Sequence, residues 1–422
     1  MHISQLKLQN FRNYSELNFT PGAGVNILYG ENAQGKTNVL EALSMLATTR
    51  SLRAGRESEL ILQATEMANV TAEVCREREG DAEIQVSVFQ TDKKAVRVNG
   101  MKRPRILDVL GQFNAVFFGS IDLNIVTGEP ADRRRYLNVE ISQISPRYVY
   151  DLAHYKRILE QRNRLLKELR ERPRPPKDSG IEAWNEQLVR FGTPIIEKRK
   201  FYLERLAPLA DQVHRELTDG KEGLQVRYLP NIPLPANEII HPEAVKEDPS
   251  EDRYSASLNK VAGEEIDEQT PPDNFRPEGS QSSLSGSESL LKAFERHLSS
   301  VAADEARRGV TLIGPQRDDI QFLIDGVEAR VYGSQGQQRT VALAIKLAEF
   351  QLIEDYIGEP PVMLLDDVMS DLDDSRRKHL LAWVRRRCQT FITCTNLRAF
   401  PKDLLEEASL FRVVRGTLVK DG

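Results

Sequence analysis

Residues 30–37 read GENAQGKT, which has the glycine-rich spacing GxxxxGKT. The apolar run 25–29 precedes this segment, and Leu40, Leu43 and Leu46 follow it at helical spacing, which predicts a strand, a loop and a helix. In such a loop the glycines let successive backbone N–H groups point into one concavity, toward which the helix N-terminus also points. The segment therefore predicts a phosphate-binding loop and a chain that binds a nucleotide.

The loop residues have distinct expected roles. Lys36 supplies a positive charge for the β- and γ-phosphates, and the hydroxyl of Thr37 is suited to hold Mg²⁺. Arg12 is a further candidate nucleotide contact because of its position beside the loop. The candidate nucleotide-binding residues of the loop itself are Gly30, Glu31, Asn32, Ala33, Gln34, Gly35, Lys36 and Thr37.

A second apolar run near the C-terminus, residues 361–365, ends in Asp366 and Asp367. A buried strand that ends in acids is typical of a Walker B element. Asp366 is the expected Mg²⁺ ligand, and Asp367 is placed to orient or deprotonate an attacking water, so Asp367 and Lys36 are the candidate catalytic residues. An Asp pair after an ordinary strand is common by itself, and it is the phosphate loop that favours the functional interpretation.

Residues 333–339, GSQGQQR, form a small polar turn ahead of an amphipathic helix. A helix N-terminus can bind an anion, and Ser334, Gly336 and Gln337 offer a hydroxyl, a close backbone approach and an amide. A plain helix cap with Ser334 at the N-cap explains the same residues on local grounds.

Charge is unevenly distributed along the chain. The net charge is −5, but residues 236–290 hold 13 acidic and 4 basic residues, a local charge of −9, so the remainder carries +4. Residues 151–177 hold nine Lys or Arg against four Asp or Glu, within a region (145–210) whose apolar spacing predicts a helical hairpin. Its charge fits either a solvated helix face or an arm that contacts phosphates.

The remaining periodicity predicts strands. Residues 69–75, 82–90 and 94–99 predict an antiparallel meander, and residues 310–314 predict another strand. The expected organisation is an N-terminal part of the nucleotide-binding head (1–144), a helical arm lobe (145–215), a connecting strand (216–235), an acidic low-complexity insertion expected to be disordered (236–287), and a C-terminal part of the head (288–422).

Several motifs occur in an order that resembles a known family. The phosphate loop, the turn at 334–337, the Asp pair and a D-loop-like segment at 370–373 resemble an ABC-type ATPase head. Segments 8–14, 30–38, 128–134, 314–319 and 334–340 resemble the RecF family of bacterial DNA replication and repair proteins, among the SMC/ABC-type heads. The resemblance implies an α/β fold: an ABC-type ATPase head with a P-loop mixed sheet and an antiparallel β subdomain, plus a helical-hairpin arm lobe.

The same resemblance implies ATP and Mg²⁺ as ligands, with the signature turn of one subunit capping the nucleotide of another. It further implies ATP-dependent homodimerisation on DNA, either duplex or a single-strand/duplex junction, without sequence preference. Action in recombinational gap repair and the SOS response with RecR and RecO, to help load RecA, is also implied. Five arginines are candidate DNA contacts: Arg133, Arg134, Arg157, Arg162 and Arg164.

Departures from the family pattern qualify these expectations. Asp367 stands where many ABC-type ATPases have Glu, so we expect slow, weak and DNA-stimulated ATP hydrolysis. Gln316 replaces a common His, and residues 119–122 leave the Q-loop ligand unassigned. The alternatives are an SMC-like structural DNA clamp and the ATPase subunit of a transporter. No apolar run approaches the ~18 residues of a membrane span, and residues 1–6 resemble neither a signal nor a transit peptide, which favours a cytoplasmic protein without membrane attachment.

Overall fold

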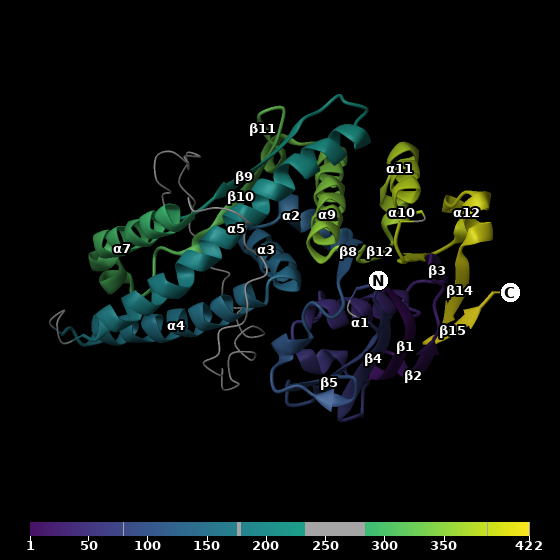
Figure 1. Ribbon diagram of the computed structural model, residues 1–422, viewed down its shortest axis with the longest axis horizontal. Coiled ribbons are helices and arrows are strands. Elements are labelled where there is room, and N and C mark those ends of the chain that lie inside the picture. Colours follow the sequence, from purple (N-terminus) through teal and green to yellow (C-terminus); the bar gives the residue numbers. More distant parts are fainter. Residues whose placement is uncertain (79, 175–178, 233–282, 386, 422) are drawn as a thin grey trace. The chain divides into compact units, whose positions relative to one another are not determined.

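The computed structural model describes residues 1–78, 80–174, 179–232, 283–385 and 387–421 (Figure 1). These residues form two compact units. The first comprises Met1–Val126, Leu209–Gly223 and Gly333–Gly422, and the second comprises Thr127–Pro208 and Leu224–Tyr332. The acidic insertion expected at 236–287 lies outside the described residues except for its last few positions, which begin a helix.

The first unit contains a mostly parallel sheet with the strand order β15-β14-β3-β13-β12-β8. Five of its strands run parallel to their neighbours, and only β15 pairs antiparallel, with β14. The strands are β3 (Val25–Tyr29), β8 (Ala115–Gly119), β12 (Val362–Asp366), β13 (Thr390–Cys394), β14 (Ser409–Val414) and β15 (Thr417–Lys420).

An antiparallel sheet of order β2-β1-β4-β5-β6-β7 completes the strands of the first unit. It contains the predicted meander, and Asn99 and Gly100 both have positive φ at the β6–β7 hairpin turn, as an Asn-Gly turn requires. The strands are β1 (His2–Phe11), β2 (Tyr14–Phe19), β4 (Met67–Cys75), β5 (Ala82–Phe89), β6 (Lys94–Val98) and β7 (Met101–Lys102).

Helix α1 (Lys36–Thr48) lies between the two sheets. It contacts β8, β12 and β13 of the parallel sheet and β4 and β5 of the antiparallel sheet. Leu40, Leu43 and Leu46 are fully buried, as their spacing predicts, and so are the residues between them, because both faces of the helix are covered. The remaining helical elements of this unit are η1 (Glu57–Leu60), η2 (Ile106–Val109), η3 (Ser120–Asp122), α9 (Gln335–Ile357), α10 (Val368–Asp371), α11 (Asp374–Val384), η9 (Leu397–Ala399) and α12 (Lys402–Glu407); α2 (Leu123–Thr127) ends at the boundary.

The second unit is mainly helical and contains the predicted hairpin as α4 (Pro146–Glu171) and α5 (Ile181–Leu217). Helix α5 is continuous through the boundary, so its last residues belong to the first unit. The other elements are α3 (Pro130–Ile144), β9 (Leu224–Leu229), α7 (Ser283–Arg308), η8 (Pro315–Arg317), β10 (Asp319–Ile324), β11 (Val327–Glu328) and α8 (Ala329–Tyr332), with the three strands in the order β11-β10-β9.

The unit boundaries differ from those expected from the sequence. Residues 127–144 group with the arm because α3 contacts α4 and β10. Residues 288–332 also belong to the second unit, since α7 contacts α4 and β10 pairs with β9. The expected division at 144 and 287 therefore does not coincide with the compact units.

The strand predicted at 310–314 is wrong. The backbone N–H groups of Thr311, Leu312 and Gly314 donate to side-chain oxygens of Asn163, Glu305 and Asn231, at 2.8, 2.8 and 3.1 Å. These side-chain oxygens accept the hydrogen bonds that the carbonyl groups of a neighbouring strand would accept in a sheet. Within the described residues, no helix is long and apolar enough to cross a membrane.

Candidate nucleotide-binding site

The phosphate loop follows the carboxyl end of β3 in the middle of the parallel sheet, where α/β proteins place their ligands. Gly30 and Gly35 have φ values of 147° and 114°, in the region that favours glycine. A Cβ on Gly30 would lie 2.6 Å from the carbonyl oxygen of Val413, and one on Gly35 would lie 2.6 Å from Nδ2 of Asn13. Both the backbone conformation and the close neighbours therefore require glycine at these positions.

The turn between β1 and β2 supports the loop from one side. Asn13 Nδ2 donates to the carbonyl of Gln34 at 3.0 Å, and the Tyr14 hydroxyl donates to the carbonyl of Gly35 at 3.1 Å. Burial raises the pKa of Tyr14 well above its ordinary value, so the hydroxyl keeps the proton that it donates. Sequence reasoning included these two residues only in segment 8–14, which resembles the RecF family, because nothing local to them indicates a contact with residues 34 and 35.

Lys36 is almost fully buried at the start of α1. Its Nζ donates to the carbonyls of Gly30 and Glu31, both at 2.7 Å, so the ammonium lies against the loop. Burial lowers the pKa of Lys36, while Asp367, Cys394 and Asp366 act in the opposite direction. The structure thus places this cation against the backbone of the loop, within electrostatic reach of the carboxylates at the end of β12.

Thr37 and Asp366 meet at the end of β12. The Thr37 hydroxyl donates to Oδ1 of Asp366 at 2.8 Å, and the Thr393 hydroxyl donates to the same oxygen at 2.7 Å. Thr393 also accepts from the backbone N–H of Asp367 at 2.9 Å, so one side chain on β13 contacts both acids. The β12–β13 register puts Asp366 opposite Thr393, a residue that is not among the candidate site residues expected from the sequence.

The donor set at this point suits Mg²⁺. A hydroxyl and a carboxylate converge next to a phosphate-binding loop, and Mg²⁺ is usually held by one or two carboxylates with phosphate oxygens and waters. In the described part of the chain, no group of three or more His, Cys, Asp or Glu side chains could hold a metal alone. Thr37 and Asp366 would therefore hold the ion jointly with the nucleotide, and the ion would supply charge to neutralise its phosphates.

Asp367 follows with a φ of 55°, in the left-handed region that L-residues rarely adopt. Its carbonyl accepts from the Ser370 hydroxyl at 2.7 Å, at the start of the D-loop-like segment. The backbone N–H bond to Thr393 and this carbonyl bond together fix the peptide at the end of β12. The strained conformation marks Asp367 as a position where geometry outweighs backbone preference.

Arg12 has an ion-pair partner inside the chain. Its Nε and Nη2 donate to both carboxylate oxygens of Glu41, at 2.9 and 2.8 Å, and its Nη1 donates to the carbonyl of Glu59 at 2.9 Å. Glu41 is buried on α1 and also accepts from Ser51. Arg12 therefore ties the β1–β2 turn to the helix that follows the loop, and its contact with a nucleotide remains a prediction.

The turn at 334–337 forms the N-terminus of α9 and is exposed at Ser334. The Ser334 hydroxyl accepts from Gln337 N at 3.2 Å, and Gln337 Oε1 accepts from Ser334 N at 2.9 Å, which is a reciprocal capping box. Gln337 Nε2 donates to Glu222 at 2.9 Å. A Cβ on Gly336 would have the guanidinium of Arg376 as its nearest neighbour, at 3.9 Å, and Arg376 pairs with Asp373 of the D-loop-like segment.

The five arginines predicted to contact DNA fall into different environments in the second unit. Arg133 is buried in a bidentate pair with Asp319, at 2.6 and 2.9 Å, and Arg162 is buried against Glu305 at 2.6 Å. Arg134 donates to the carbonyl of Asp318 at 3.1 Å. Arg157 and Arg164 are exposed. Charge counting could not separate these cases, because it does not show which arginine has an acid next to it in the fold.

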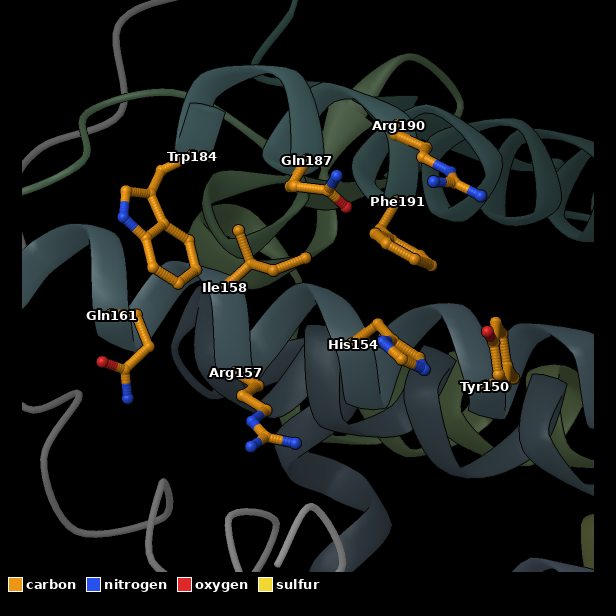
Figure 2. Close-up of a pocket in the computed structure, with 9 residues that line it drawn as sticks. All are labelled: Tyr150, His154, Arg157, Ile158, Gln161, Trp184, Gln187, Arg190 and Phe191. Atoms are coloured by element: carbon orange, nitrogen blue, oxygen red, sulfur yellow. The ribbon is translucent and has the colours of Figure 1, made fainter. Parts of the chain in front are cut away.

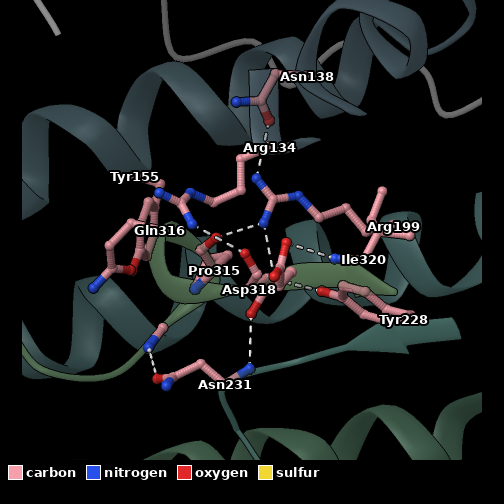
Figure 3. Close-up of polar contacts among 12 residues, drawn as sticks. Arg134, Asn138, Tyr155, Arg199, Tyr228, Asn231, Pro315, Gln316, Asp318 and Ile320 are labelled. Carbon is pink, nitrogen blue, oxygen red and sulfur yellow. Dashed lines mark hydrogen bonds and ion pairs between the residues drawn. The ribbon is translucent and has the colours of Figure 1, made fainter. Parts of the chain in front are cut away.

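Segment 314–319 forms a buried polar cluster, shown in Figure 3. Asp318 is fully buried and accepts from Arg199 Nη1 at 2.8 Å, from the backbone N–H of Asn231 at 2.9 Å and from the Tyr228 hydroxyl. Gln316 accepts from the Tyr155 hydroxyl. Burial, and next the charge of Asp318, raise the pKa of Tyr228, so its hydroxyl remains a donor. In this structure the motif joins strands and helices of the second unit.

The fold and the loop define an ABC-type ATPase head, and the chain belongs to the family described as RecF/RecN/SMC N terminal domain, which it matches over residues 2–415. Curated relatives named "DNA replication and repair protein RecF" match it along its full length. The protein from Oceanobacillus iheyensis is 36% identical over 418 residues, covering 99% of this chain and all of the relative. The protein from Lysinibacillus sphaericus is 37% identical over 424 residues, covering both chains completely.

Solved structures give the same relationship. The structure described as the recombination mediator protein RecF-ATP in the RecFOR pathway is 31% identical, with a TM-score of 0.80, and covers 100% of this chain and 98% of that one. An SMC head bound to a winged-helix domain of ScpA is 13% identical, with a TM-score of 0.50, and covers 100% of this chain and 98% of that one. The second likeness concerns the fold alone.

Proposed function

We propose that the chain is an ATP-dependent DNA-binding protein of recombinational gap repair, in which ATP drives dimerisation and slow hydrolysis permits release. The observation that carries this proposal is the convergence of Lys36, Thr37 and Asp366 at the phosphate loop. A nucleoside triphosphate with Mg²⁺ requires a positive charge, a hydroxyl and a carboxylate beside one phosphate-binding loop. The solved relative described above as RecF-ATP supports ATP as the nucleotide.

Dimerisation is proposed from the signature turn. Ser334 is exposed, and in the described part of the chain the side chains of Ser334 and Gln337 bond to each other's backbone and to Glu222, not to the phosphate loop. The turn thus has a helix N-terminus and a hydroxyl available for the phosphates held by a second copy. Gly336 and Gln337 belong to the same proposed contact, as do the loop residues 30–37 of the facing subunit.

Slow turnover is proposed from Asp367. Aspartate is one methylene shorter than glutamate, and the strained backbone at this position fixes where its carboxylate begins. A general base must lie within about 2.6–3.2 Å of the proton that it accepts, so a shorter side chain positions water less well. Asp367→Asn should retain ATP binding and lose phosphate release, and a basal rate above roughly 10 s⁻¹ for the unchanged chain would contradict the proposal.

For DNA contact we retain Arg157 and Arg164, which are exposed on α4, and Arg134 as a weaker candidate. Arg133 and Arg162 are left out because their guanidinium groups are buried in ion pairs. Contact through phosphates would make binding independent of sequence and dependent on salt. Cooperation with RecR and RecO, and help in loading RecA, are proposed from the family relationship and from the RecFOR pathway named for the solved relatives.

Sedimentation velocity with ATP, with DNA and with both tests the proposal directly. The expected result is a shift from monomer to dimer with ATP, and a faster-sedimenting complex when DNA is added. Lys36→Ala should remain monomeric under all conditions because the loop loses its phosphate-binding cation. Lys7→Ala, an exposed lysine on β1, is the matched control and should behave like the unchanged chain. A dimer that forms equally without ATP would contradict the proposal that ATP drives dimerisation.

A further inference from the structure

A pocket of about 610 Å³ lies between α4 and α5 in the second unit, and none of the residues that line it is assigned to the nucleotide site (Figure 2). Its size falls within the range of roughly 300–1,000 Å³ that small-ligand pockets occupy. One wall comes from α4 and the other from α5, the two helices of the arm. The lining residues are Tyr150, His154, Arg157, Ile158, Gln161, Trp184, Gln187, Arg190 and Phe191.

Flat rings dominate the pocket. His154 and Phe191 stack with centroids 4.7 Å apart and planes 8° from parallel, and Tyr150 lies against both, at 4.3 and 6.2 Å. Trp184 reaches from α5 into the space between the helices, toward Ile158 and Gln161 (Figure 2). It is partly exposed and lies about two helical turns before Phe191 on the same helix. The arrangement offers an existing stack and a separate indole face.

The charged side chains that line the pocket are basic. Arg157 on α4 and Arg190 on α5 are both exposed, and no carboxylate is among the lining residues that the structure describes. Burial, and then the two arginines, lower the pKa of His154, so this ring is neutral at physiological pH. Its Nε2 is buried and has no hydrogen-bond partner within the described chain.

We propose that this pocket binds an unpaired base of single-stranded DNA. A base would stack on Trp184, whose indole is partly exposed, and the amides of Gln161 and Gln187 would meet its polar edge. Arg157 and Arg190 would contact the flanking phosphates. Aromatic platforms beside a basic wall bind single strands with little sequence preference, because every base has a π-face. The inference rests on the proposed DNA-binding function and adds single-stranded DNA to the ligands of the chain.

Trp184 can report on its own environment. The chain has two tryptophans, and Trp383 packs edge-on against Phe350 in the first unit, so Trp383→Phe leaves Trp184 as the single indole. Titration of this variant with a dT₁₂ oligonucleotide should quench the Trp184 emission, and a blunt duplex of the same length should not. Unchanged emission at saturating dT₁₂ would overturn the proposal.

Variants assayed with a fluorescent dT₁₂ probe extend the test. Trp184→Ala should weaken single-strand binding by roughly five- to a hundredfold, the range for loss of one base stack, and Trp184→Phe should restore most of it. Arg157→Gln and Arg190→Gln should each lower the salt slope of single-strand binding by about 0.7. Lys167→Gln, at an exposed lysine on α4 outside the pocket, is the control and should leave the affinity for the dT₁₂ probe unchanged.

The remaining outcomes separate the two proposals. If the unchanged chain shows no ATP-dependent duplex binding, the proposed function is wrong. If it binds duplex but dT₁₂ does not quench Trp184, only the single-strand site in the pocket is wrong. Quenching by poly-Glu and not by dT₁₂ would contradict the proposal and show that the pocket binds an acidic peptide instead of a base. Equal loss of duplex and single-strand binding in Trp184→Ala, with no restoration by Trp184→Phe, would mean that the indole only supports the hairpin.

Discussion

Thr37 and Asp366 are 329 positions apart in the chain, yet the Thr37 hydroxyl donates to the Asp366 carboxylate at 2.8 Å. The contact exists because β12 and β3 both lie in the parallel sheet with β13 between them, so their carboxyl ends share one edge. Thr393 on the intervening strand holds the same carboxylate oxygen at 2.7 Å. The two expected Mg²⁺ ligands are therefore already oriented toward each other.

Asp366→Asn should weaken ATP binding in the presence of Mg²⁺ and leave it nearly unchanged in EDTA. Loss of a charged contact of about 1.5–3 kcal/mol corresponds to roughly a ten- to hundredfold change in affinity. Fluorescent-nucleotide titration with and without Mg²⁺ measures the difference. Asp374→Asn, an exposed acid on α11, is the control, and equal weakening in EDTA would argue that Asp366 acts only by holding the loop.

Ser334→Arg should bind ATP like the unchanged chain but fail to dimerise, because a long cation would occupy the proposed contact with the second nucleotide. The substitution also removes the N-cap of α9, which costs about 1 kcal/mol, too little to unfold the unit. Sedimentation with ATP measures the dimer. Ser300→Arg on α7 introduces the same charge elsewhere, and an ATP-dependent dimer of Ser334→Arg would refute capping by the partner.

Arg162→Met should destabilise the second unit without a selective loss of DNA affinity. Glu305 is fully buried, and removing its partner leaves an uncompensated charge at a cost of about 3–5 kcal/mol. Urea unfolding measures the change, and replacing Glu305 by Gln in the same variant should recover much of it, because Gln removes the charge and keeps an acceptor for the backbone N–H of Leu312. Arg164→Met, at an exposed pair with Glu168, should change stability by less than about 1 kcal/mol. Normal stability with weakened DNA binding in Arg162→Met would restore this arginine as a DNA contact.

Cys388 and Cys394 should not react with a thiol reagent at pH 8 in the folded chain. Burial raises the pKa of Cys388 to about 11 and that of Cys394 to about 12, so almost no thiolate is present below pH 9. Labelling followed by mass spectrometry identifies the modified residues. Cys75, which is partly exposed, should react first, and all three should react in denaturant. Rapid native labelling of Cys394 would indicate that the end of β13 opens.

Local sequence was sufficient for features whose physics is local. The glycines at 30 and 35, the leucine spacing of α1, the Asn-Gly turn and the capping residues of α9 are set by backbone conformation and by neighbours within a few positions. The apolar spacing of residues 145–210 likewise predicted the helical arm. The family relationship was also readable from the sequence, because the motifs occur in a fixed order.

Only the tertiary structure decided which residues meet. Arg133 and Arg162 have the same local signature as Arg157, but Asp319 and Glu305 neutralise the first two from 186 and 143 positions away. Residues 310–313 are β-branched or apolar, yet the backbone N–H groups of Thr311, Leu312 and Gly314 donate to side chains of Asn163, Glu305 and Asn231, two of which lie 148 and 83 positions away. Thr393 acquired its contact with both acids through strand register alone. The sequence by itself determined the phosphate loop, whereas long-range pairing determined which side chains complete it.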